Sequence, residues 1–270
     1  MAEQQDWFPL VRKNLKLYRI FTSEPALALL NSEATQNTAL PLAKQSEIDN
    51  IDNMLAFTTI TLISTTFLAS VAAAIGVAAT PHNQYSSSVG VLGCHINTDR
   101  VAYWPEPVDC NNICVKLSYG GRSLHLLRVD QSGGAYDVSY DAWNYLLTGR
   151  SAKDAPTTGG AISMDYVDVP ASECADLLHT AGNKLPLSAP NSMNYLSSCL
   201  GQSGSWVANH YVLYNILNPV CTRGHDETCS LNWPAQNQAT CPHPLGDPAP
   251  LTSAPVYNIQ YPSGQVVLAQ

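Results

Sequence analysis

The sequence predicts a mainly β fold with one short helix, followed by a disulfide-rich extension of mixed α and β structure. Between residues 91 and 174, short runs of alternating apolar and polar residues are separated by turn residues, a pattern typical of half-buried strands. All eight cysteines lie after residue 93. Residues 176–270 contain both helical and extended patterns, and no long linker precedes them, so we expect them to pack on the first region.

Residues 54–74 are typical of a secretory signal peptide. No charged residue occurs from Leu55 to Pro81, and small residues around Ala72 follow the apolar run, as they do at a signal-peptide cleavage site. The alternative is a membrane anchor, because the uncharged stretch is long enough to cross a bilayer, although its five threonines make it a poor permanent span. Since a signal peptide belongs at the N-terminus, we expect translation to begin at Met54 and residues 1–53 to be an over-extended start. The alternative is a cytoplasmic tail on an anchored protein.

The first exported region is predicted element by element. Residues 75–87 are expected to be an irregular lead-in. Residues 115–119 alternate in polarity, and two glycines then lead into residues 123–129, which predicts a β-hairpin. Ser139 is a suitable N-cap for a helix over residues 140–147 that Gly149 ends. Residues 161–167 predict a further strand.

The C-terminal extension is expected to combine a helix with strands. Residues 191–200 predict a helix after Pro190. Residues 206–217 are expected to form an extended, largely buried strand. Residues 256–261 and 265–268 are joined by a Pro-Ser-Gly turn and predict a terminal hairpin.

The cysteines indicate an oxidising compartment. Their even number and their confinement to the exported part predict four disulfides, and the alternative is buried free thiols in a cytosolic protein. Eight cysteines allow 105 pairings, so the sequence assigns none of them. The eight residues are Cys94, Cys110, Cys114, Cys174, Cys199, Cys221, Cys229 and Cys241.

The order of the motifs resembles that of the double-psi β-barrel superfamily, which includes rare lipoprotein A-like proteins, the first domain of expansins, barwin, kiwellins and barwin-like endoglucanases. Residues 120–123 resemble the family's N-G-[KR]-[ST] hairpin, and residues 128–130 its V-x-D strand end. Residues 136–139 resemble the x-D-L-S motif before the helix, and residues 160–169 the closing strand, which Cys174 follows as in expansins. The resemblance implies a six-stranded double-psi β-barrel over residues 88–175. The exported part also resembles secreted fungal proteins in its glycine, serine and tyrosine content.

The resemblance implies a groove in which Asp137 matches the general acid of barwin-like endoglucanases. Hydrolysis of a glycosidic bond normally needs a second carboxylate. The stretch that matches the family's second acid, residues 83–90, contains none, and Tyr103 stands where lytic transglycosylases of the rare lipoprotein A type have a histidine. Asp99, Glu106 or Asp109 could supply the missing carboxylate.

Asp137 and Asp130 also have structural interpretations. An aspartate just before a helix can accept hydrogen bonds from backbone N–H groups and stabilise the helix entrance, a role open to Asp137. We expect Asp130 to close the turn before Gly133.

Aromatic residues gather in the same region, and flat rings suit sugar binding because their faces stack on the apolar face of a pyranose. The alternative is core packing, which we favour for Trp143 on the apolar face of its helix. Tyr103, Trp104 and Tyr136 are therefore the aromatic candidates for an exposed groove. With Asp130 and Asp137 they form the predicted ligand-binding set.

The charge balance and the spacing of possible metal ligands argue against nucleic-acid binding and metal binding. The chain has 13 basic and 21 acidic residues, a net charge of −8, and no basic block, so nucleic acid is not an expected partner. Residues 221–243 offer cysteine and histidine ligands, but their spacing is not that of a zinc finger and oxidised cysteines do not bind zinc. We expect neither a metal nor a cofactor.

Together these observations predict a secreted, monomeric protein, extracellular or in the cell wall, that binds cell-wall polysaccharide without hydrolysing it. One alternative is a glycan-cleaving enzyme, endoglucanase-like or lytic transglycosylase-like, with Asp137 as general acid. A second alternative is a protein that binds a secreted host protein, as an effector or protease inhibitor of the barwin or kiwellin type.

Overall fold

The computed structural model describes residues 73–270. The predicted extension over residues 1–53 lies outside these residues, as does the predicted signal peptide except for its last two residues. Within residues 73–270, no helix is both long and apolar enough to cross a membrane.

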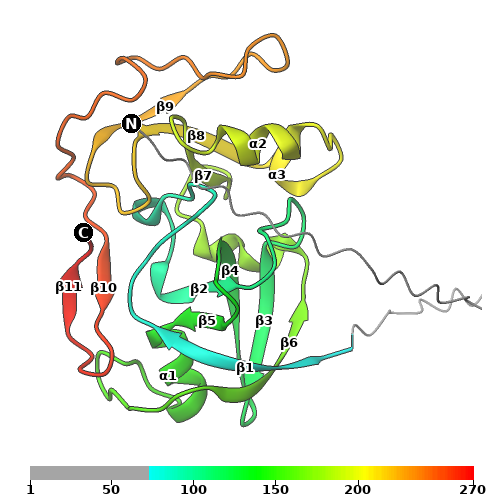
Figure 1. The fold of residues 1–270 in the computed structure, drawn as a ribbon, viewed down its shortest axis with the longest axis vertical. Helices are drawn as coiled ribbons and strands as arrows, with labels where there is room; N and C mark the ends of the chain where they lie inside the picture. Colours follow the sequence, from blue (N-terminus) through cyan, green and yellow to red (C-terminus); the bar gives the residue numbers. More distant parts are fainter. Residues whose placement is uncertain (1–72) are drawn as a thin grey trace, which may run out of the picture. The chain divides into compact units, whose positions relative to one another are not determined.

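Six strands form a closed barrel (Figure 1). They are β1 (Ile75–His82), β2 (Val101–Trp104), β3 (Cys114–Tyr119), β4 (Arg122–Gln131), β5 (Tyr136–Ser139) and β6 (Ile162–Asp168). Their order around the barrel is β1-β5-β2-β4-β3-β6, with β1–β5 and β2–β4 parallel and the other described pairs antiparallel. The prediction of a mainly β fold built on a six-stranded barrel is confirmed.

The first strand corrects the prediction of an irregular lead-in over residues 75–87. β1 pairs with β5 on one side and β6 on the other, so it closes the barrel, and Val77 and Ala79 are buried in the interior. The barrel therefore begins at residue 75 rather than 88. Small residues dominate this strand and give it a weak β-pattern, and its partner strands lie far along the chain.

The hairpin and the helix follow the prediction closely. Gly120 and Gly121 join β3 to β4 with φ of 56° and 78°, the left-handed conformations that a tight two-residue hairpin turn requires. Helix α1 (Tyr140–Thr148) ends at Gly149, whose φ of 79° terminates the helix. Ser139 occupies the N-cap position, but its hydroxyl donates to the carbonyl of Asp99 instead of capping the helix.

The C-terminal half contains helices, a three-stranded sheet and a hairpin. Strands β7 (Leu185–Ser188), β8 (Tyr211–Ile216) and β9 (Gly224–Cys229) form the sheet, and β10 (Tyr257–Ile259) pairs with β11 (Val266–Leu268). Helix α2 (Met193–Leu200) confirms the predicted helix. The predicted strand over residues 206–217 begins instead as the helical turn α3 (Trp206–Asn209), because the Ser205 hydroxyl accepts from the Ala208 N–H and caps it. Three short 3-10 helices complete the described chain: Gly93–His95, Thr98–Arg100 and Ala171–Leu177.

The extension packs on the barrel, as predicted. One core fills the barrel interior, and a second lies between the outer face of β2 and β4 and the C-terminal half. All eight cysteines form disulfides. Cys94–Cys221 and Cys110–Cys199 join the barrel region to the extension, Cys114–Cys174 lies within the barrel region, and Cys229–Cys241 closes a loop in the extension.

Candidate functional site

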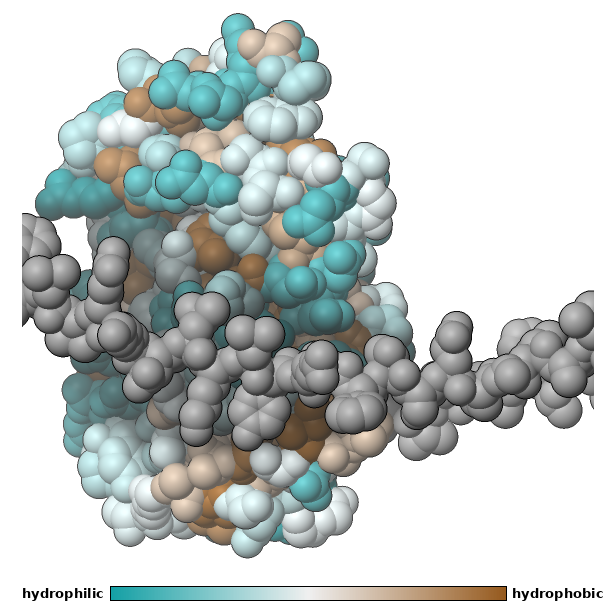
Figure 2. All heavy atoms as spheres, turned by 45° about the vertical axis from the view of Figure 1, so that its right-hand side comes forward, coloured by the Kyte–Doolittle hydropathy of each residue, from teal (hydrophilic) through white to brown (hydrophobic). Residues whose placement is uncertain are grey.

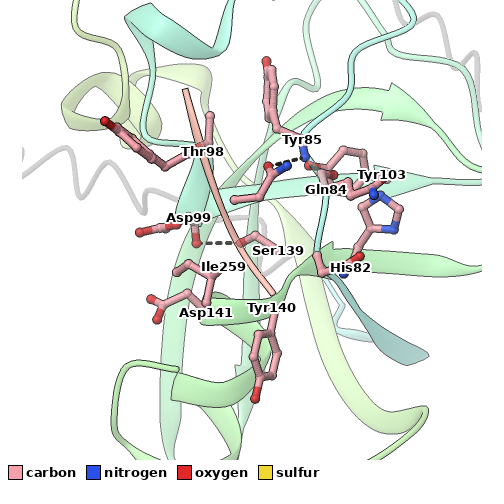
Figure 3. A pocket seen from close by; sticks show the side chains of 13 residues that line it. His82, Gln84, Tyr85, Thr98, Asp99, Tyr103, Ser139, Tyr140, Asp141 and Ile259 are labelled. Atoms are coloured by element: carbon pink, nitrogen blue, oxygen red, sulfur yellow. Dashed lines mark hydrogen bonds between the residues drawn. The ribbon is translucent and has the colours of Figure 1, made fainter. Parts of the chain in front are cut away.

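A cleft opens between the end of the first barrel strand and the C-terminal hairpin. Residues 83–85, directly after β1, form one wall, and residues 258–270 form the other. The cleft has a volume of about 290 Å³ and adjoins a smaller inner pocket of about 20 Å³. In the inner pocket His82 and Tyr103 lie on one side, with Thr98, Asp99 and Asp141 on the other (Figure 3).

We call the larger space the carboxamide cleft after the side chains that surround it. Its lining residues are Asn83, Gln84, Tyr85, Asn258, Gln260, Val267, Leu268 and Gln270. Five of these carry a carboxamide, which both donates and accepts hydrogen bonds, and no lining side chain is charged at neutral pH. Three of the five are exposed residues: Gln84, Gln260 and Gln270. Such a lining suits a neutral ligand rich in hydroxyl groups.

Two buried tyrosines fix the wall formed by residues 83–85. The Tyr85 N–H donates to Asn258 Oδ1 at 2.9 Å and so ties this wall to the hairpin, while the Tyr85 hydroxyl donates to the Val91 carbonyl at 2.8 Å. The Tyr103 hydroxyl donates to the Gln84 carbonyl at 3.2 Å. Burial raises the pKa of both phenols, so they remain protonated donors. The cleft is therefore largely preformed.

The two carboxylates of the inner pocket are already paired with basic residues. Asp141 accepts from Arg100 Nη1 at 2.7 Å, from the Ser151 hydroxyl at 2.5 Å and from the Ala152 N–H at 2.7 Å. Burial alone would raise the pKa of Asp141, but these hydrogen bonds outweigh it and hold the pKa below its usual value. Asp99 pairs with Lys153 at 2.8 Å. Both carboxylates are thus placed for structural roles.

Asp137 lies on the outer face of β5, beside the inner pocket. It is half-buried, and the hydroxyl of Thr80, its partner across the β1–β5 pair, donates to its carboxylate. Two residues further along the same strands, His82 and Ser139 line the inner pocket, and the His82 ring lies 4.6 Å from that of Tyr103. The predicted bonds from Asp137 to helix N–H groups are replaced by this bond to Thr80.

Asp130 differs from its predicted role in the turn before Gly133. Its carboxylate accepts from the Ser86 hydroxyl at 2.5 Å, the Ser88 N–H at 2.9 Å and the Gln131 N–H at 2.8 Å. Asp130 therefore holds the segment after the cleft wall against the barrel.

The expected exposure of Tyr103 and Trp104 is wrong. Tyr103 is 4% exposed and Trp104 is 1% exposed. Strand β2 is covered on both faces, because Trp104 points into the barrel core and Tyr103 into the core shared with the C-terminal half. Neither ring can stack on a sugar in this arrangement.

Tyr136 is only half-buried, but its side chain lies on the opposite face of β5 from that of Asp137. Its hydroxyl donates to Glu106 Oε1 at 3.0 Å, and its ring meets that of Trp104 edge-on, with centroids 5.4 Å apart. Since successive strand residues point to opposite faces, Tyr136 faces the barrel interior and Asp137 the outside. Tyr103, by contrast, is the cross-strand partner of both Asp137 and Asp130, so the fold brings these three predicted residues together. Because Tyr103 is buried, they do not line an open groove with Tyr136 and Trp104.

The three candidates for a second catalytic carboxylate each bind other groups of the protein. Glu106 accepts from Tyr136 on the other side of β5 from Asp137, and Asp109 accepts from the N–H groups of Asn111 and Asn112 at 2.5 and 2.6 Å. Asp99 pairs with Lys153. Each of the three carboxylates is therefore already held by a hydrogen bond or an ion pair of its own.

The two histidines of residues 221–243 form hydrogen bonds with carboxylates. His225 Nε2 lies 2.9 Å from Asp247 Oδ2, and His243 Nδ1 lies 2.6 Å from Glu227 Oε2. The two imidazole rings stack with centroids 3.9 Å apart. Among residues 73–270 there is no group of three or more potential ligands arranged to hold a metal ion.

The sequence analysis missed the carboxamide cleft itself. Its walls come from segments about 175 residues apart. Gln84 lies in residues 83–90, which the sequence analysis searched only for a carboxylate, and Gln260 belongs to no motif. No protein-family model matches this sequence, and no curated protein matches it either.

Proposed function

We propose that this protein is an exported, double-psi-type barrel protein of fungal origin that binds a neutral cell-wall polysaccharide in the carboxamide cleft without hydrolysing it. The observation that carries the proposal is the lining of the cleft, in which carboxamides stand beside Val267 and Leu268 and charged side chains are absent. Each sugar hydroxyl donates and accepts a hydrogen bond, as each carboxamide does. The two aliphatic side chains offer contact to sugar C–H groups.

The size and rigidity of the cleft fit this proposal. Its 290 Å³ lies at the small end of the ligand pockets of proteins, about 300–1,000 Å³, which suits a short stretch of a longer chain. The bond from Tyr85 to Asn258 holds the two walls in register before the ligand arrives, which lowers the entropic cost of binding.

The absence of hydrolysis is supported by the state of the carboxylates. A glycosidase places two carboxyl groups on either side of the scissile bond. Here Asp99 and Asp141 are paired with Lys153 and Arg100, and Asp137 accepts a bond from Thr80.

The test uses the full chain mixed with insoluble chitin, cellulose, β-glucan and peptidoglycan, with loss of protein from solution and release of soluble sugar read from the same tubes. We expect loss of protein without release of sugar. The Gln84→Ala, Gln260→Ala double variant should bind about tenfold more weakly, since each lost hydrogen bond contributes about 0.5–1.5 kcal/mol. Asn194→Ala with Gln202→Ala, exposed carboxamides elsewhere, is the matched control. Sugar release that Asp137→Asn abolishes would make the protein an enzyme instead.

A second candidate, binding of a secreted host protein, is favoured by the exposed apolar side chains of the hairpin. Tyr257, Val266 and Leu268 are 51%, 50% and 53% exposed. This function predicts saturable binding to a protein partner that Val266→Asp disrupts while polysaccharide binding is unchanged.

A further inference from the structure

A disulfide-closed loop in the C-terminal half forms a neutral, amide-rich surface. Cys229–Cys241 joins the ends of residues 230–240, and Ser230 and Thr240 exchange backbone hydrogen bonds of 2.9 and 2.8 Å just inside it. We call residues 230–240 the tryptophan loop. In Figure 1 it extends beyond β9, at the end of the described fold opposite to α1. None of its residues is charged.

The tryptophan loop carries an exposed ring. Trp233 is 36% exposed, whereas Trp104 and Trp143 are almost completely buried. Trp206 is half-buried and stacks on His210, with ring centroids 4.8 Å apart. Among the tryptophans of residues 73–270, Trp233 thus presents the most accessible ring.

Carboxamides share the surface around that ring with Pro234 and Ala235. Asn232, Gln236, Asn237 and Gln238 are all exposed, and Trp233 lines a shallow hollow of about 650 Å³ together with the last three of them. Hydrophilic side chains predominate at this end of the described fold (Figure 2).

The base of the tryptophan loop is anchored. Ala239 is buried, and the Gln236 N–H donates to the Asn232 carbonyl at 2.8 Å across the turn. With the disulfide, these contacts limit the conformations available to the loop before binding, so less entropy is lost when a ligand is held.

We infer that the tryptophan loop is a second glycan-binding site, in which the Trp233 ring stacks on the C–H face of a sugar and the surrounding carboxamides bond its hydroxyl groups. The inference rests on the proposed function, because it takes the same class of ligand, a neutral polysaccharide. A polymer that occupies both the carboxamide cleft and the tryptophan loop is retained more strongly than one that occupies either alone.

The test uses the full chain with hexasaccharides of β-1,3-glucose, β-1,4-glucose and N-acetylglucosamine, and reads acrylamide quenching of tryptophan fluorescence. We expect at least one hexasaccharide to protect part of the emission. Trp233→Tyr should lose that protected emission yet retain insoluble polysaccharide, because tyrosine keeps a flat ring. Trp233→Leu keeps apolar bulk without the ring, and should bind about three- to tenfold more weakly, as for loss of one aromatic contact.

The outcomes separate the two sites. If no hexasaccharide protects Trp233, and Trp233→Leu retains polysaccharide like the wild type, the tryptophan loop is not a glycan site, while the cleft is judged by its own Gln84, Gln260 variant. If the Gln84, Gln260 variant binds polysaccharide normally and Trp233 is protected, the tryptophan loop is supported as a glycan site and the cleft proposal fails. Weaker polysaccharide binding by Trp233→Leu supports the inference only if the unfolding midpoint of this variant matches that of the wild type. If the midpoint is lower, the Gln236→Ala, Gln238→Ala double variant must show the same weaker binding. Normal binding by that pair would overturn the inference.

Discussion

Replacing Cys110 and Cys199 by alanine removes one of the two disulfides that join the barrel region to the C-terminal half. The bond spans 89 residues of sequence, but the loop that it closes is shorter while Cys114–Cys174 remains. The shortest covalent route between Cys110 and Cys199 then passes through the Cys114–Cys174 disulfide and contains 29 residues: 4 from Cys110 to Cys114 and 25 from Cys174 to Cys199.

The loop length sets the expected loss of stability. The chain-entropy relation gives about 3.6 kcal/mol for a loop of 29 residues, against about 4.6 kcal/mol if the full 89 residues counted. For Cys229–Cys241, with a separation of 12, the same relation gives about 2.8 kcal/mol. The Cys110→Ala, Cys199→Ala variant should therefore be the less stable of the two double variants.

The assay is guanidinium unfolding of each oxidised variant, followed by circular dichroism and extrapolated to water. Alanine is chosen because both positions are buried and a serine hydroxyl there would need a hydrogen-bond partner. A loss below about 1 kcal/mol for the Cys110, Cys199 variant, or a larger loss for the Cys229, Cys241 variant, would refute the reasoning from loop closure.

Three further predictions concern acid stability, the core and processing. Burial alone would raise the pKa of Glu227, but hydrogen bonds from His243 and Asn215 lower this pKa to about 2 from its ordinary 4.5. The ionised carboxylate therefore stabilises the fold fully above pH 4.5, and this stabilisation is lost as the pH falls towards 2. Glu227→Gln should flatten this part of a stability–pH profile, and an unchanged profile would contradict it. Asn144, fully buried, donates to two carbonyls and accepts from Thr157, so Asn144→Ala should lower the unfolding free energy by about 3 kcal/mol in the same guanidinium assay, and a loss under about 1 would count against it. N-terminal sequencing of any processed form of the protein should give a first residue no later than Ile75, since a later start would remove part of β1.

The sequence predicted the elements that local pattern determines. The hairpin of β3 and β4 follows from alternation and the Gly120-Gly121 turn, and α1 follows from its apolar face and Gly149. Strand β1 was missed because its barrel position depends on parallel pairing with β5, whose residues lie 57 positions away. A local pattern carries no information about such a partner.

The candidate site was predicted less well, for a related reason. Residue type suggested that Tyr103 and Trp104 would be exposed, but both faces of β2 are covered, one of them by the C-terminal half. The cleft depends on the approach of Gln84 to Gln260, which tertiary packing alone brings about. The disulfide pairing likewise depends on the fold, since 105 pairings satisfy the sequence.

The most direct test of glycan binding in the carboxamide cleft follows the side-chain amide signals of the isotope-labelled full chain by nuclear magnetic resonance during titration with the three hexasaccharides. Single variants assign the signals of Gln84 and Gln260. We predict that both shift with one hexasaccharide and saturate together, while the amide of Asn194 does not move. Absence of any shift at Gln84 and Gln260, with all three sugars at saturating concentration, would contradict the proposal.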